Sequence, residues 1–325
     1  MLLRIGLLIL LQVAGVASIT IALFQDKVHE SRTIERQSQG KAFLEHVSQL
    51  LYDVSVYNYL TVDGGNRALV ASKSQMIDSQ FEILEKLHQQ FSHTLNIRIS
   101  DLVMMNKEHM TPKDLKRQWS TAKSASADPY LSTMSHAALI QNLRELTDWA
   151  LEFSRVQADI YQEISLLSEL VWVKIPEIFD IQAQFLLLKY TAEADEYASL
   201  LESYLDSNLE GIRNTISKLR YILDGGQLLA FQEKIENSYE TLLIHHSKLK
   251  QSQFETAELI ANIQDTERFY KSSLDFFQSL SNHQKNVQKN LPIFFLGSGA
   301  GLLFLSIILT IVFAGASGAI DPAKP

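Results

Sequence analysis

The stretch that decides how this chain folds is Ile293–Ala314, which reads IFFLGSGAGLLFLSIILTIVFA and carries no charged residue. A helix of about 22 residues is about 30 Å long, which matches the hydrocarbon thickness of a lipid bilayer. Inside lipid every backbone N–H and C=O must be paired internally, and a helix does this. A buried helix of a soluble protein normally keeps a polar face, and this stretch has none. We therefore predict a transmembrane helix over residues 291–316.

A second apolar run, Ile5–Phe24, follows Arg4. It has two interpretations. A cleaved signal peptide would use the small residues of Val16-Ala17-Ser18, whereas an uncleaved anchor would use the whole run. We favour the anchor because the apolar residues continue past that point to Phe24. Residues 5–24 are then a first transmembrane helix, and residues 1–4 a short cytoplasmic N-terminus.

Between the two predicted spans lies one large domain, residues 25–290, and after them a short segment, residues 317–325. Lysines and arginines near the spans do not orient the chain clearly, and long loops cross membranes largely regardless of charge. An N-terminal apolar run usually directs export of the chain behind it. We therefore expect a multi-pass protein of the inner (cytoplasmic) membrane with an extracytoplasmic main domain and a cytoplasmic C-terminal segment.

Composition narrows the class of protein further. The 325 residues carry a formal net charge of −8, which argues against a nucleic-acid partner. There is no cysteine, so disulfides and thiolate metal sites are excluded. Only 13 glycines and 6 prolines interrupt the chain, which favours long helices.

Apolar side chains recur with a helical period throughout residues 25–290. The three clearest stripes follow steps of three and four residues and comprise Phe43, Val47, Leu50, Val54 and Tyr57; His136, Ile140, Leu143 and Thr147; and Ile178, Ile181, Phe185 and Leu188. No stretch alternates as a β-strand does over more than a few residues. The sequence predicts an all-α fold, an elongated bundle of four to six long helices flanked by two transmembrane helices.

Glycines and prolines predict where these helices begin and end. Gly64-Gly65 and Gly225-Gly226 each indicate a tight turn. Thr111 followed by Pro112 predicts a helix start, because threonine caps a helix and proline fits its first turn.

The longest helices are expected in the second half of the domain. One is predicted from Pro129 to about Val173, ended or kinked by Pro176. The next is predicted to begin there and to continue to Leu223, with a bend at Gly211.

No arrangement of residues supports catalysis. The chain lacks a phosphate-binding glycine loop, a cysteine nucleophile and a serine nucleophile elbow. No two histidines are spaced i, i+4, and the adjacent His245 and His246 point about 100° apart on a helix. We interpret the nine histidines as residues of solvated helix faces. The sequence therefore predicts no enzyme, no catalytic residue, no metal site and no cofactor.

Polar residues near aromatic ones suggest a different kind of site. His136, Ser154, Arg155 and Asp159 come close in sequence to Trp149, Phe153 and Tyr161. A small-molecule pocket between helices needs such groups, so these four are the candidate ligand-binding residues. The alternative is that they cap or bridge neighbouring helices.

Gly297 and Gly301 form a G-x-x-x-G pair within the second predicted span. Small residues four positions apart let two helix backbones approach closely. The partner helix is either the first span or a second subunit.

The segment His136–Pro176 resembles the extracytoplasmic input region of bacterial methyl-accepting chemotaxis proteins and related HAMP-containing sensor histidine kinases. The residues that carry the resemblance are His136, Leu139-Ile140, Ser154, Asp159 and Ile175-Pro176, with Trp119 and Tyr59-Leu60 upstream. The chain departs from the family pattern at Ile160, where a proline is usual, and at Ser165-Leu166, where a tyrosine pair is usual.

The resemblance implies a homodimeric receptor that senses an extracytoplasmic signal and transmits it through the membrane by helix displacement. The final residues, SGAIDPAKP, resemble the start of a HAMP linker. The competing interpretation is a structural or adaptor protein with two spans, whose helical domain binds another protein rather than a small molecule.

Overall fold

A computed structural model describes residues 18, 33, 35–62, 67–125, 128–156, 161–188, 190, 194–251 and 257–283. The chain divides into one unit of Met1–Arg32 with Ser279–Pro325 and a second unit, Thr33–Gln278, which holds nearly all of the described residues. The predicted spans, residues 5–24 and 291–316, lie outside the described residues apart from Ser18, and so do Gly297 and Gly301. Among the described helices, none combines the length and the hydropathy that crossing a bilayer requires.

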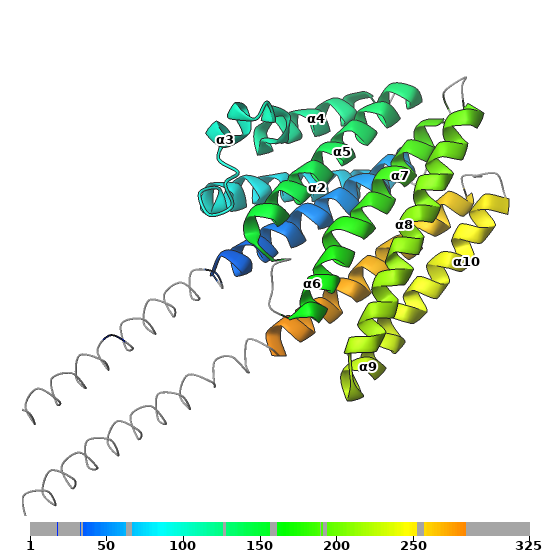
Figure 1. Ribbon diagram of the computed structural model, residues 1–325. Coiled ribbons are helices and arrows are strands. Elements are labelled where there is room, and N and C mark those ends of the chain that lie inside the picture. The colour runs from blue at the N-terminus through cyan, green and yellow to red at the C-terminus, as the bar shows by residue number, and fades with distance from the viewer. Residues whose placement is uncertain are drawn as a thin grey trace, which may run out of the picture. The chain divides into compact units, whose positions relative to one another are not determined.

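The described residues are almost entirely helical and contain no strand, so the all-α prediction is confirmed. In chain order the elements are residues 35–62, α2 (Arg67–Phe91), α3 (Ile99–Met104), the 3-10 turn η1 (Glu108–Met110), α4 (Pro112–Ser124), α5 (Pro129–Ser154), α6 (Gln162–Glu169), the π-helical turn η3 (Leu170–Lys174), α7 (Ile175–Leu188), α8 (Ala194–Ile222), α9 (Gly225–Phe231), the π-helical turn η4 (Gln232–Glu236), α10 (Asn237–Gln251) and residues 257–283 (Figure 1). Residues 35–62 are named the first helix below, and residues 257–283 the last helix.

The first helix, α2, α4 and α5 form an antiparallel bundle, named the N-terminal bundle. His46 of the first helix bonds the carbonyl of Gln80 at 2.8 Å, which joins the first helix to α2. The indole N–H of Trp119 donates to Asp78 at 2.7 Å and joins α4 to α2. Tyr57 lies 5.4 Å from His136, ring centre to ring centre, and joins the first helix to α5. Each helix therefore packs against its neighbour in the sequence, and the first closes on the fourth.

The continuous helix α6–η3–α7, then α8, α9–η4–α10 and the last helix form a second antiparallel bundle, named the C-terminal bundle. Asn208 of α8 donates to Glu177 of α7 at 2.5 Å. The hydroxyl of Tyr239 in α10 donates to the Leu209 carbonyl of α8 at 2.6 Å. Serine hydroxyls link α10 to the last helix, and Gln182 links the last helix back to α7. The two bundles thus share one topology.

The two bundles pack side by side through four helices, which three contacts illustrate. Arg144 of α5 forms an ion pair with Asp180 of α7 at 3.0 Å. Tyr52 of the first helix lies 5.6 Å from Phe179 of α7, ring centre to ring centre. Gln278 of the last helix donates to Glu45 of the first at 3.0 Å. The core is therefore continuous across the junction.

The three predicted apolar stripes are confirmed, because every residue in them is buried. The predicted helix start is also confirmed: α4 begins at Pro112, and the Thr111 hydroxyl accepts the N–H of Asp114. Gly225 adopts a left-handed conformation (φ 46°) at the turn before α9, as expected. The other predicted turn, at Gly64-Gly65, lies outside the described residues.

The predicted helix from Pro129 to Val173 is wrong, because α5 ends at Ser154 and α6 begins only at Gln162. Arg155 takes the left-handed conformation (φ 57°), and the Ser154 hydroxyl accepts the N–H of Val156. Both features end a helix: a left-handed residue stops the spiral, and a serine oxygen replaces a helical acceptor.

Pro176 does not end a helix either. The π-helical turn η3 lies directly before α7, in which Pro176 is the second residue. Proline has no N–H to donate to the preceding turn, and a π-helical turn relieves that mismatch without breaking the rod. The helix predicted to reach Leu223 is instead divided, since α7 ends at Leu188 and α8 begins at Ala194. These divisions are why there are more helices than the four to six predicted.

Candidate functional site

The candidate site is the interface at which the first and last helices pack against each other, which is named the seam. Lys41 lies 4.8 Å over the ring of Phe277, and Lys271 lies 5.7 Å over the ring of Tyr52. Together with the bond from Gln278 to Glu45, these contacts join earlier residues of the first helix to later residues of the last helix. The two helices are therefore antiparallel neighbours along their length.

Buried hydroxyls line this seam without bonding. Ser48, Tyr270 and Ser273 are each at most 2% exposed. Within the described part of the chain the Ser273 hydroxyl has no hydrogen-bond partner, and the hydroxyls of Ser48 and Tyr270 lie close enough to interact without forming a hydrogen bond of ordinary geometry. Burial raises the pKa of Tyr270, and the neighbouring Ser48 partly opposes this shift. An unpaired buried polar group costs about 1–3 kcal/mol unless a water molecule bonds it. The seam is therefore held together less firmly than its burial suggests.

The last helix meets α7 through a partly satisfied polar network. The side-chain amide of Gln182 donates to Asn262 at 2.8 Å and to Thr266 at 2.9 Å, and all three side chains are buried. The oxygen of Gln182 and the amide nitrogen of Asn262 find no partner among the described residues. The network therefore makes two hydrogen bonds and leaves two buried amide atoms unpaired.

Both π-helical turns lie against the last helix at the same level. Trp172 in η3 packs 4.7 Å from Phe277, edge to face, and its buried indole N–H bonds nothing within the described residues. Next to η4, Phe231 packs 5.6 Å from Phe276. Isolated π-helical turns are rare and frequently accompany functional sites. Residues 276 and 277 are therefore flanked by the two least regular turns of the C-terminal bundle.

A different polar group fixes the first helix to α2. The carboxylate of Asp53 is 1% exposed and accepts bonds from Lys73 at 2.5 Å, Gln80 at 2.5 Å and Gln49 at 3.1 Å. A buried charge this well paired holds two helices in one register, because any slip would leave it unpaired. The first helix is thus held by a buried ion pair on the α2 side, and by cation–π contacts and the bond from Gln278 to Glu45 on the side of the last helix.

His136 lies in the core of the N-terminal bundle. Its Nδ1 donates to the Ser132 carbonyl at 2.7 Å, and its ring lies between Tyr57 and Trp119, 5.9 Å from the latter. Burial lowers its pKa to about 4, so the ring is neutral at pH 7. Its Nε2 has no partner among the described residues.

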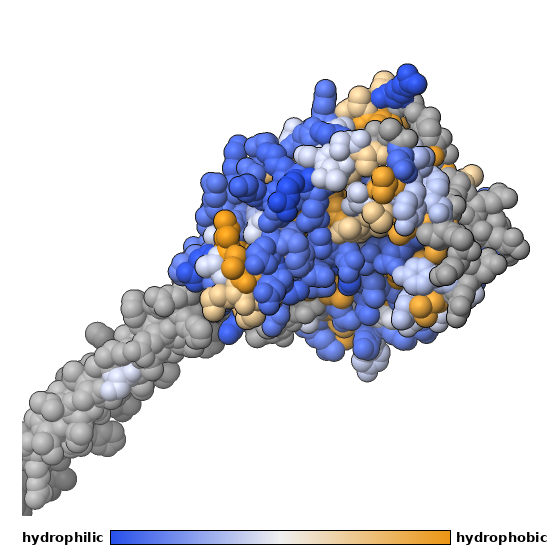
Figure 2. All heavy atoms as spheres, turned by 90° about the horizontal axis from the view of Figure 1, so that it is seen from above, coloured by the Kyte–Doolittle hydropathy of each residue, from blue (hydrophilic) through white to orange (hydrophobic). Residues whose placement is uncertain are grey.

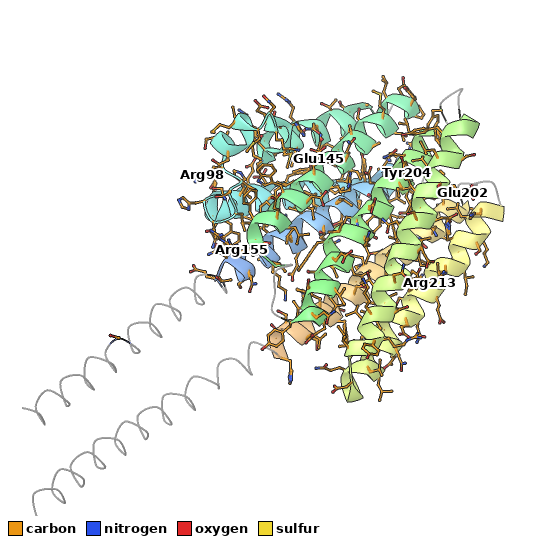
Figure 3. All side chains as sticks on the ribbon, in the orientation of Figure 1. Arg98, Glu145, Arg155, Glu202, Tyr204 and Arg213 are labelled. Atoms are coloured by element: carbon orange, nitrogen blue, oxygen red, sulfur yellow. The ribbon has the colours of Figure 1, made fainter. Side chains whose placement is uncertain are left out.

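Ser154 and Arg155 lie far from His136. Ser154 follows it by 18 positions along α5, which is about 27 Å at the helical rise, and Arg155 is the next residue. A Cβ added to Gly40 would lie 2.1 Å from the Ser154 Cβ, so the first helix and α5 approach each other closely at Ser154. The carbonyl of Arg155 accepts a bond from Gln37 at 3.1 Å, and its side chain is exposed (Figure 3).

These positions separate the candidate ligand-binding residues. His136 and Ser154 cannot line one small pocket, and Asp159 lies outside the described residues. The geometry of Ser154 and Arg155 agrees with the alternative interpretation, in which such groups bridge and cap helices. A ligand-binding role for any single one of the four stays a prediction.

The interpretation of the histidines as solvated is wrong for the buried His88, His136 and His246, and His46 and His245 are half-buried. Besides His136, His46 and His88 each bond a backbone carbonyl, and burial lowers the pKa of both. His246 bonds Asp206 at 2.8 Å, and His245 bonds Asp265. In the described part of the chain no three histidine or acidic side chains are grouped to hold a metal ion.

Sequence reasoning missed the polar face of the last helix, although a signal was present. Asn262, Thr266 and Ser273 follow one another by four and seven positions, the spacing of a single helix face, among apolar residues. Polar residues inside an apolar stripe are the mark of a buried polar seam.

Comparisons with known proteins returned no match: no family model, no curated protein and no solved structure is significantly similar to this chain.

Proposed function

We propose that this chain is the input module of a membrane receptor, which senses an extracytoplasmic signal and transmits it by displacing the last helix against the first. The observation that carries the proposal is the seam between these helices. They are direct antiparallel neighbours, and each is the described helix nearest in sequence to one of the two apolar stretches, Ile5–Phe24 and Ile293–Ala314.

The chemistry of the seam suits a displacement. Several buried hydroxyl and amide atoms around the last helix have no hydrogen bond to lose when that helix shifts, so a displacement breaks only the few side-chain bonds that it makes to its neighbours. Two arrangements that differ by a few kcal/mol are enough for a signal to change their populations. The resemblance of His136–Pro176 to chemoreceptor input regions points to the same function and to a homodimer in the bilayer. We propose no catalytic step.

Membrane residence and orientation are tested by labelling single cysteines, since the chain has none of its own. Ser72→Cys places a thiol on the exposed face of α2, and Lys324→Cys places one in the predicted cytoplasmic segment. With the full chain in bacterial cells, a membrane-impermeant maleimide should label the first variant in intact cells and the second only after permeabilisation. Recovery of the chain in the soluble fraction, or the reverse labelling pattern, would refute the proposal.

Signal binding is tested by thermal unfolding of the full chain in lipid nanodiscs with pools of amino acids and organic acids. A compound at a hundredfold excess over its Kd stabilises the folded form by about 2.7 kcal/mol. Stabilisation by one pool supports the sensor. If no pool stabilises the chain and a protein partner co-purifies with it, the adaptor interpretation replaces the sensor.

A further inference from the structure

The short helix α3 and the turn after it expose a compact group of large apolar side chains. Ile99 is 59% exposed, Val103 45%, Met104 80% and Met105 58%. On the face that Figure 2 shows, hydrophobic side chains lie in separate small groups among largely hydrophilic ones. Contiguous exposed apolar groups in a protein mark a surface that contacts something else. These four residues are named the α3 patch.

The α3 patch is held firmly, although it lies between helices. Leu102 of α3 is fully buried and anchors the helix in the core. The N–H of Lys107 returns to the Leu102 carbonyl at 2.8 Å, and Asn106 takes the left-handed conformation (φ 55°) that this turn needs. The indole N–H of Trp149 donates to the Asn96 carbonyl at 3.2 Å, just before α3. The exposed side chains therefore belong to a defined surface.

The α3 patch lies at a particular end of the N-terminal bundle. Trp149 and Glu145, which hold the α3 region, belong to the C-terminal half of α5. That half packs on the start of the first helix, as the bond from Gln37 to the Arg155 carbonyl shows. Because the first and last helices are antiparallel, Gln278 is at this end as well. The patch thus shares its end of the bundle with the beginning of the first helix and the end of the last.

From this end the chain continues toward both apolar stretches. Phe24 precedes residue 35 by about ten residues, which reach at most about 36 Å even when extended. If the stretches span a bilayer, this end of the N-terminal bundle is the end that the chain tethers to it, and the α3 patch belongs to that end. This step rests on the proposed function.

We infer that the α3 patch inserts into the interfacial layer of the lipid bilayer and fixes the base of the N-terminal bundle against the membrane. Flexible methionines adapt to an irregular apolar environment, and the nearby Arg98 is already paired with Asp101 at 3.2 Å. The contact is therefore apolar and does not require anionic lipids.

A second protein copy fits the α3 patch less well than lipid does. A stable protein interface takes about 800 Å² from each partner, which a six-residue helix and one turn do not supply. A lipid contact needs less, because the two spans would already hold the patch next to the bilayer and raise its effective concentration there. If the patch holds the N-terminal bundle at the membrane, the last helix can move relative to a bundle that stays in place.

The test places one environment-sensitive fluorophore on the full chain in zwitterionic nanodiscs that contain lipids with a spin label near the headgroup. Met104→Cys carries the fluorophore on the α3 patch. Met134→Cys is the matched control, a 41% exposed methionine near the other end of α5. Ile308→Cys reports the second predicted span with a spin label in the acyl chain. We expect quenching at 104 and 308, none at 134, and no change at 104 when salt is added.

The outcomes separate this inference from the proposed function. Quenching at 308 without quenching at 104 overturns the membrane contact and leaves the receptor proposal standing. No quenching at 308 refutes the predicted span on which both depend. Quenching at 104 that disappears with added salt overturns an apolar contact. Fluorophores at 104 that quench each other, without quenching by spin-labelled lipid, show that a second copy covers the patch and overturn the inference.

Discussion

The N-terminal and C-terminal bundles share a topology, and each leaves some buried polar atoms unpaired within the described residues, but they differ in one buried carboxylate, one buried tryptophan and the regularity of their helices. In the N-terminal bundle, Asp53 has three bonding partners and the indole N–H of Trp119 bonds Asp78. In the C-terminal bundle, the indole N–H of Trp172 bonds nothing within the described residues, and two π-helical turns interrupt its helices. The difference teaches that one architecture can hold a fully paired buried charge in one bundle and π-helical turns in the other. Four predictions test it, from the largest expected effect to the smallest.

Lys73→Met should cost about 3–5 kcal/mol of unfolding free energy, because it leaves the buried Asp53 carboxylate without its cation. The same substitution in the other bundle, Lys271→Met, removes a lysine whose side chain is 55% exposed and should cost about 0.5 kcal/mol or less. Urea unfolding of both variants measures the contrast. Equal losses would show that Asp53 does not fasten the first helix.

Gly40→Ala should cost about 1–3 kcal/mol, since its Cβ would overlap Ser154 at a close approach of two helices. Gly211→Ala is the matched variant in α8, where the new Cβ would lie 3.4 Å from the flexible end of Lys174. There the gain in helix propensity should leave stability unchanged or raise it by about 0.5–1 kcal/mol. If Gly40→Ala leaves the thermal unfolding temperature unchanged, the first helix and α5 are not tightly packed at this position.

Acidification should weaken the N-terminal bundle first. The pKa of His136 falls to about 4 on folding, below its ordinary value of 6.5, so the unfolded chain binds the proton more tightly. Stability is therefore complete above about pH 6.5 and falls as the pH drops toward 4, with about 2 kcal/mol lost between pH 7 and pH 5. The lowered pKa values of His46 and His88 act in the same direction.

The variant His136→Gln should remove most of the loss assigned to His136, and His93→Gln, on an exposed residue, serves as its control. Hydrogen exchange at pH 7 and pH 5 locates the effect. If protection is lost first in α8 and α10, the comparison between the bundles is wrong.

Two tryptophan substitutions test the same contrast at the smallest scale. Trp119→Phe and Trp172→Phe each remove a buried indole and leave a similar void, but only Trp119 also loses a bond to a carboxylate. We expect Trp119→Phe to cost about 1.5 kcal/mol more than Trp172→Phe, the value of a hydrogen bond to a charged group. The denaturant midpoints of the two variants, measured side by side, compare these losses of stability. A larger loss for Trp172→Phe than for Trp119→Phe would contradict the prediction.

The sequence predicted the buried face of each helix but not its partner. The stripe from Phe43 to Tyr57 is buried as expected, because a 3.6-residue period reports orientation directly. Which helix that face meets depends on long-range packing, and nothing in the stripe indicates that the last helix lies beside it. The break after Ser154 was missed because apolar periodicity does not register a single left-handed residue.

The candidate site was predicted less well than the fold. His136, Ser154 and Arg155 are close in sequence, but a straight helix places the first of them about 27 Å from the others. The buried seam depends on Ser48 and Tyr270, which are more than 200 positions apart, so no local pattern could have joined them.

The central claim is that the last helix moves relative to the first while the N-terminal bundle stays fixed. Spin labels at Ala42→Cys and Asp275→Cys, both exposed, report the distance between the two helices in full-length chain in nanodiscs. Labels at Ala42→Cys and Glu152→Cys report a distance inside the N-terminal bundle. On adding a compound that stabilises the chain, the account predicts a shift of about 1–2 Å between 42 and 275 and none between 42 and 152. An unchanged distance between 42 and 275 with the compound bound would contradict it.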